Sequence, residues 1–284
     1  IALSAGTLSD AAGNAMSSFS IGTNLGANKA LIIDTTVPTV SSVSSTTADG
    51  VYKVGDVIAV TTTFNENVTV TGTPQLTLET GTTDAVVDYS SGSGGSTLTF
   101  NYTVTSDDTS IDLDYGGTSS LVLNSGAIND AAGNSATLTL ASPGASNSLG
   151  ANKALVVDGA VPTVSSVSSS SGAGYYNEGD TLALTVTFSE EVTVTGTPTL
   201  TLETGLTDAV ANYTSGSAST VLTFRYIVAS GNNSSDLDYA STTALALNSG
   251  TIADAAGNNA NLTLAAPAAA NSLGSNKALI IDST

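Results

Sequence analysis

The chain contains one long sequence twice. The segments 35–158 and 159–282 align without a gap, and 78 of their 124 aligned positions are identical. Each copy begins directly after an apolar run that ends on a carboxylate, Asp34 or Asp158, and a proline follows four residues later. Proline fixes φ and favours extended backbone around it, so this phrase suits the start of a new strand. We therefore expect the two acids to mark joints between copies of one module.

The first 34 residues resemble only the last part of each copy. They include Asp10-Ala11-Ala12-Gly13-Asn14, which recurs in both long segments, and the run from Asn28 to Asp34, which recurs unchanged in the second and with Val in place of both Ile residues in the first. The sequence predicts three domains: the C-terminal part of an incomplete repeat at 1–34, and complete repeats at 35–158 and 159–284. An incomplete β-domain would expose strand edges and an apolar face. We expect upstream sequence of a longer protein, or another molecule, to complete it.

Apolar residues alternate with a period of two, as in half-buried strands. Ile58, Val60, Thr62 and Phe64 share one face of a predicted strand, and clusters of Gly, Ser, Asn and Asp punctuate the chain. This pattern predicts an all-β fold, an antiparallel two-sheet sandwich of about eight short strands in each copy. A helix is expected at most as a single turn near residues 130–134.

The composition excludes several classes of function. Only five Lys and Arg residues oppose 24 Asp and Glu residues, so the formal charge of −19 would repel nucleic acid and anionic membranes. Without Cys or His the chain offers no thiol, no imidazole base and no typical zinc site. No apolar run approaches the roughly 20 residues that span a bilayer. Bound cations would offset such a negative charge, so cation binding is expected.

The acidic residues recur with the repeat. If strands alternate in direction, Asp130 and Asn134 approach Asp158, and Glu190 of the next module reaches the same joint; the Gly-Asp turn at Asp56 could contribute. Calcium takes six to eight oxygen ligands, and such a set supplies them. The complete predicted calcium set is Asp10, Asp34, Glu66, Asp130, Asn134, Asp158, Glu190, Asp254 and Asp282. The alternative is that these are solvated turn residues, because Asp, Asn and Gly dominate turns for backbone reasons.

A second acidic pattern lies within a predicted strand. Asp112 and Asp114, with their counterparts Asp236 and Asp238, stand two residues apart. They could form a second cation site. An exposed polar strand face explains them equally well.

Several phrases resemble a known type of repeat. Asp34-Thr-Thr-Val-Pro-Thr, Phe64-Asn-Glu-Asn-Val-Thr-Val and Asp130-Ala-Ala-Gly-Asn are similar to the tandem bacterial Ig-like, cadherin-like repeats of large calcium-dependent cell-surface adhesins, especially the repeat type of swimming-motility-associated surface proteins and biofilm adhesins. The resemblance implies an extracellular rod of β-sandwiches, often stiffened by calcium at the joints. It would give the linker role to Asp34 and Asp158, the loop role to Asp130, and the role of the acid in the following domain to Glu66 and Glu190. The linker here carries one acid, unlike the acid-rich linkers of true cadherins.

Two structural functions therefore compete. The chain could be an extender rod of an adhesin, which contacts neighbouring repeats and holds a surface or glycan ligand site that lies outside this chain. Alternatively it could be a subunit of an extracellular filament or surface layer, in which copies join by β-strand complementation. An enzyme such as a glycosidase is disfavoured, because every candidate acid is repeated and lies in a turn or at a joint. A carbohydrate-binding module is disfavoured by the lack of an exposed aromatic trio.

Overall fold

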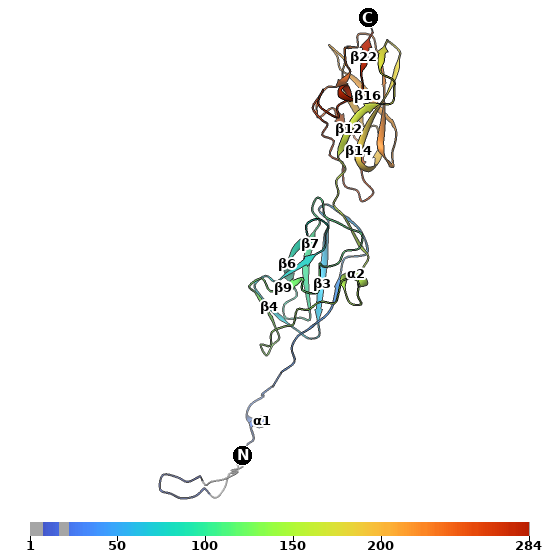
Figure 1. The fold of residues 1–284 in the computed structure, drawn as a ribbon. Coiled ribbons are helices and arrows are strands. Elements are labelled where there is room, and N and C mark those ends of the chain that lie inside the picture. Colours follow the sequence, from blue (N-terminus) through green and yellow to red (C-terminus); the bar gives the residue numbers. More distant parts are fainter. Residues whose placement is uncertain (1–7, 17–22, 284) are drawn as a thin grey trace.

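The computed structural model describes residues 8–16 and 23–283, and over these residues the chain is all-β. Two sandwiches of largely antiparallel sheets follow one another end to end, and the described residues before the first sandwich, 8–16 and 23–34, run outside both (Figure 1). The predicted fold class is confirmed. Among the described residues, no helix has the length and apolar character needed to cross a membrane.

The first sandwich combines a six-stranded sheet, a three-stranded sheet and a strand pair. The orders are β1-β3-β7-β6-β5-β9, β2-β11-β8 and β10-β4. The strands are β1 (Val40–Ser45), β2 (Gly50–Lys53), β3 (Val57–Phe64), β4 (Thr69–Thr71), β5 (Gln75–Leu78), β6 (Ala85–Ser91), β7 (Thr97–Thr103), β8 (Thr109–Ser110), β9 (Leu121–Val122), β10 (Ala127–Asn129) and β11 (Leu155–Asp158).

The second sandwich repeats this arrangement, with one long strand, β14, in place of β3 and β4. Its sheets run β12-β14-β17-β16-β15-β19, with β20 and β21 added beside β15 and β14, and β13-β22-β18. The strands are β12 (Val164–Ser169), β13 (Gly174–Tyr176), β14 (Thr181–Thr195), β15 (Thr199–Glu203), β16 (Ala209–Ser215), β17 (Ser219–Ile227), β18 (Asn233–Ser234), β19 (Asp238–Tyr239), β20 (Leu245–Ala246), β21 (Thr251–Ala253) and β22 (Leu279–Asp282).

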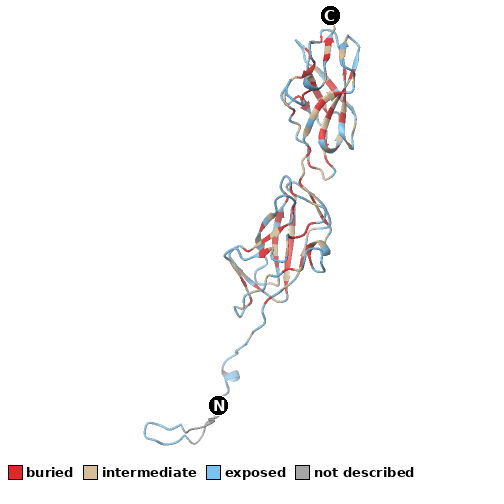
Figure 2. Cartoon of the chain, in the orientation of Figure 1, coloured by how far each residue is buried: buried red, intermediate tan, exposed pale blue. Residues whose placement is uncertain are grey.

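Each sandwich has its own apolar core. One cluster of buried residues runs from Val43 to Val157 in sequence and the other from Val167 to Ile281 (Figure 2). The predicted inward face of β3 is buried, since Ile58 and Val60 are fully inaccessible and Phe64 is 3% exposed. Burying each such side chain stabilises the fold by about 1.5–3 kcal/mol. Period-two alternation therefore identified the core face correctly.

The helical turns lie elsewhere than predicted. The structure has one-turn helices at α1 (Leu25–Asn28), α2 (Leu149–Asn152) and α3 (Leu273–Asn276), each with a side-chain N-cap from Asn24, Ser148 or Ser272. Residues 130–134 form a loop instead. There the Asp130 carboxylate accepts the backbone N–H groups of Ala132, Gly133 and Asn134, and Gly133 takes φ 95°, which a right-handed helix does not allow.

The last part of each copy runs in an unexpected direction. β11 pairs with β2 in parallel, and Thr137 bridges Thr39 in parallel as well. Residues 138–140 belong to no strand. The last part of the copy therefore runs in the same direction as the first strand, which is divided into β1 and β2. Between Asp130 and Asp158 the chain passes only once from one end of the sandwich to the other.

Candidate cation site where the chain enters each sandwich

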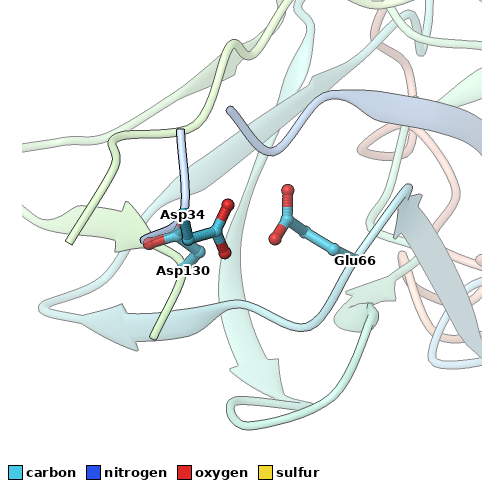
Figure 3. Close-up of side chains that lie close together, drawn as sticks. All are labelled: Asp34, Glu66 and Asp130. Atoms are coloured by element: carbon cyan, nitrogen blue, oxygen red, sulfur yellow. The ribbon is translucent and has the colours of Figure 1, made fainter. Parts of the chain in front are cut away.

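Three carboxylates converge where the chain enters the first sandwich. Asp34 lies in the link before β1, Glu66 lies in the turn between β3 and β4, and Asp130 follows β10. One oxygen from each lies within 4.8 Å of those from the other two (Figure 3). The pairing of β4 with β10 brings the segments carrying Glu66 and Asp130 to the same end.

The Asp130 loop is rigidly hydrogen-bonded and holds the link. Asp130 Oδ1 accepts the backbone N–H groups of Ala132, Gly133 and Asn134 at 2.9, 2.7 and 2.8 Å. The Asn134 amide donates to Asp130 Oδ2 at 2.7 Å, and to the backbone carbonyls of Asp34 and Thr36 at 3.2 Å each. These bonds, the one from the Asn134 side chain above all, lower the pKa of Asp130, so this carboxylate is held ionised.

Glu66 is the member of the site whose charge is least satisfied. Its Oε1 is buried and has no hydrogen-bond partner. Burial, followed by the negative charges of Asp34 and Asp130, raises the pKa of Glu66. Among the described residues the one ion pair joins Lys153 to Asp49, so no basic side chain is paired with this cluster. A buried carboxylate oxygen that faces two other carboxylates is the arrangement that a hard cation neutralises.

The second copy repeats the arrangement with Asp158, Glu190 and Asp254. The Asp254 Oδ1 accepts the N–H groups of Gly257 and Asn258, and the Asn258 amide donates to Asp254 Oδ2 and to the Asp158 carbonyl, both at 2.8 Å. Burial and then the charges of Asp254 and Asp158 raise the pKa of Glu190. Within the described residues, only the first set brings its oxygens within 4.8 Å of one another.

The second loop also joins the two sandwiches. Lys53 Nζ, at the end of β2, donates to the Gly257 carbonyl at 3.1 Å, and the backbone N–H of Val54 donates to Asn258 Oδ1 at 3.0 Å. Asn258 therefore contacts the first sandwich, the link and its own loop at once.

The grouping predicted for Asp130 is wrong. Asp130 and Asn134 were expected beside Asp158 and Glu190, but they lie against Asp34, at the opposite end of the first sandwich from Asp158. The prediction assumed that successive strands alternate in direction, whereas both the segment at Thr137 and β11 run parallel to the start of the repeat, so the chain passes along the sandwich only once between Asp130 and Asp158. Asp158 and Glu190 do lie near one another, with Asp254 of the following copy in the place predicted for Asp130.

The remaining acids of the predicted set have other surroundings. Asp10 forms the same loop with Asn14, whose amide donates to Asp10 Oδ2 at 2.9 Å, and Asp282 is the exposed last residue of β22. The Asp56 carboxylate, named as an additional contributor, accepts the Lys53 N–H at 3.0 Å and closes a turn. Sequence reasoning missed Lys53 and Asn258 as joint residues, and only the recurrence of Asn in the loop phrase hinted at the latter.

The second acidic pattern falls beside α2. Asp114 is 9% exposed, and its two oxygens accept the N–H groups of Tyr115 and Gly144 at 2.9 Å each. Asp112 and Asp114 both approach Gly150, where an added Cβ would lie 3.4 and 3.1 Å from their Oδ2 atoms. These backbone contacts give Asp114 a structural role, and Asp236 and Asp238 lie against Gly274 in the same way.

Comparison with known proteins gives no family. No protein-family model and no curated protein sequence matches this chain. Its function is therefore inferred from the geometry of its own residues.

Proposed function

We propose that the chain is a non-catalytic, extracellular structural region, an extender rod of a large bacterial cell-surface adhesin whose joints are stiffened by calcium. The observation that carries this proposal is the unpartnered, buried Oε1 of Glu66 between Asp34 and Asp130. The ligands would be Asp34, Glu66 and Asp130 in the first set, and Asp158, Glu190 and Asp254 in the second. Near-identical copies suit a spacing role better than two separate chemistries.

Calcium at these positions would control the joint. Each set combines one residue of the link with two residues of the sandwich that follows. An ion shared among them would hold the link against the sandwich and fix the angle at which the chain enters. Without the ion, three carboxylates repel one another, which weakens the attachment of the link.

Calcium titration tests the proposal. Bound calcium stabilises the folded state by RT ln(1 + [Ca]/Kd), about 2.7 kcal/mol at a hundredfold excess over Kd, so chelator should lower the Tm. In Glu66→Gln Glu190→Gln this calcium-dependent gain should largely disappear. Small-angle scattering should show a straighter particle with calcium than with chelator.

The matched control is Glu79→Gln, because Glu79 is exposed on the chain after β5 and belongs to neither set. It should keep the full calcium response. Identical melting curves with calcium and with chelator, or an unchanged response in the double variant, would overturn the proposal.

A further inference from the structure

Residues 24–34 repeat the unit that ends each complete sandwich. They are identical to 272–282 at nine of 11 positions and differ only at Asn24 and Ala27, which correspond to Ser272 and Ser275. Both units contain a one-turn helix, α1 or α3, followed by the sequence Lys-Ala-Leu-Ile-Ile-Asp.

In the second sandwich this unit is part of the core. Leu273 and Leu279 are fully buried and Ile281 is 2% exposed. β22 is the central strand of its sheet, parallel to β13 on one side and antiparallel to β18 on the other. The Asn276 amide ties α3 to β12 by donating to the Val167 carbonyl at 2.8 Å.

In the first unit the same side chains face solvent. Leu25 is 66% exposed, Leu31 65% and Ile33 90%. The helical turn is nevertheless formed and capped, since Asn24 Oδ1 accepts the Ala27 N–H at 2.8 Å. Within the described residues, 29–34 belong to no sheet, and the unit runs outside both sandwiches (Figure 1). Within the described residues, the apolar side chains that a last strand buries in a sandwich are therefore exposed in this unit.

We propose that residues 24–34 are a strand donor, and that their partner is a β-sandwich of this repeat type that lacks its own last strand. The donor would lie between strands equivalent to β13 and β18, with Ile32 beside the equivalent of Tyr175, as Ile280 is in β22. This inference rests on the repeat architecture used in the proposed function and requires no ion. Leu25, Leu31 and Ile33 would exchange water for an apolar core.

Docking of the donor would also set the position of the next sandwich. Asp34 would leave the acceptor sandwich at the place where Asp158 leaves the first one, so the following sandwich would stack as the second copy does here. In the 284-residue chain the unit 272–282 is covalently tethered to its slot and outcompetes any donor from another molecule. The whole chain should therefore remain monomeric.

A shortened chain that ends at Asn271 tests the proposal, because each molecule then holds one donor and one empty slot. The experiment is run in chelator, so that failure of the calcium proposal cannot affect its outcome. Size-exclusion chromatography with light scattering should show linear head-to-tail polymers of the shortened chain and monomers of the 284-residue chain. A shortened chain that remains monomeric while folded would overturn the proposal.

Two variants separate docking from non-specific aggregation. Leu31→Asp Ile33→Asp in the shortened chain should abolish the polymers. Ile32→Cys Tyr175→Cys should form disulfides between molecules, which are unambiguous because the chain has no other cysteine. Polymers that persist in the first variant, or that contain no disulfide in the second, would contradict donor docking.

If circular dichroism shows the second sandwich unfolded in the shortened chain, a synthetic peptide of residues 23–34 is added. It should restore the β-spectrum, and the same peptide with Asp at positions 31 and 33 should not. Failure of the unmodified peptide to restore folding would overturn the proposal.

Discussion

Two carboxylates at the same site, those of Asp130 and Glu66, differ in how far hydrogen bonds stabilise their negative charge. Asp130 accepts three backbone N–H groups and an amide, whereas the Oε1 of Glu66 accepts none. The sequence identified both by their recurrence with the repeat. It could not show which of them would be left unsatisfied, because that depends on how loops distant in sequence pack at one end of the sandwich.

The raised pKa of Glu66 and Glu190 gives a signed pH dependence. A carboxyl group with a raised pKa in the folded state binds more protons there than in the unfolded chain, so its contribution to stability falls as pH rises above the ordinary value of 4.5. In chelator, Glu66→Gln Glu190→Gln should therefore melt at a higher temperature than the unmodified chain at neutral pH. Below pH 4.5 the two should melt alike. Thermal unfolding across this range measures the difference.

With calcium at neutral pH, the unmodified chain should melt at a higher temperature than the double variant, since the ion favours the carboxylates that the glutamines replace.

The pKa of Asp130 is shifted in the opposite direction, so Asp130 affects stability in a different pH range. Its lowered pKa adds stability above 3.8 that is lost as pH falls further, and both proteins share this contribution. A double variant that melts below the unmodified chain in chelator at neutral pH would contradict the repulsion described for this site.

At the scale of elements, alternation and turn residues were enough to predict the fold class and the buried face of β3. They could not give the direction of the last segment, because a strand's apolar pattern is the same whichever way it runs. The parallel pairing of β11 with β2 depends on the division of the first strand at residues 46–49. The error in the expected position of Asp130 follows from this one difference.

The hairpin between β6 and β7 depends on a glycine. Gly92 has φ 111°, and an added Cβ would lie 2.1 Å from the Thr97 carbonyl oxygen. Gly92→Ala should therefore lower the free energy of unfolding by about 1–3 kcal/mol or more, measured in urea. Gly117→Ala is the control, because a Cβ there meets nothing within 4 Å. Equal urea midpoints for the two variants would show that the hairpin can relax around the methyl group.

Across the whole molecule, the two copies are alike in their cores and differ at their ends. Lys53 and Val54 reach the loop of the second copy, but the same positions in that copy are Asn177 and Glu178. A joint built on the second copy would therefore lack the ammonium group and add a carboxylate. Nearly identical sandwiches can in this way form joints that carry different net negative charge and so differ in how much a bound cation would stabilise them.

The parallel pairing of β11 with β2 has a consequence for a rod under tension. The chain enters each sandwich at one end and leaves at the other (Figure 1), so pulling on the rod drags β11 lengthwise along β2. The rungs from Leu155 to Asp158 then share the load in shear, whereas a hairpin pulled from its open ends breaks one rung at a time. Force spectroscopy through the two termini should give higher unfolding forces than pulling through cysteines placed at Asp84 and Thr105, the open ends of the β6-β7 hairpin. Equal forces would mean that the last strand bears no load, and higher ones would mean that each sandwich is a mechanical clamp set along the line of pull.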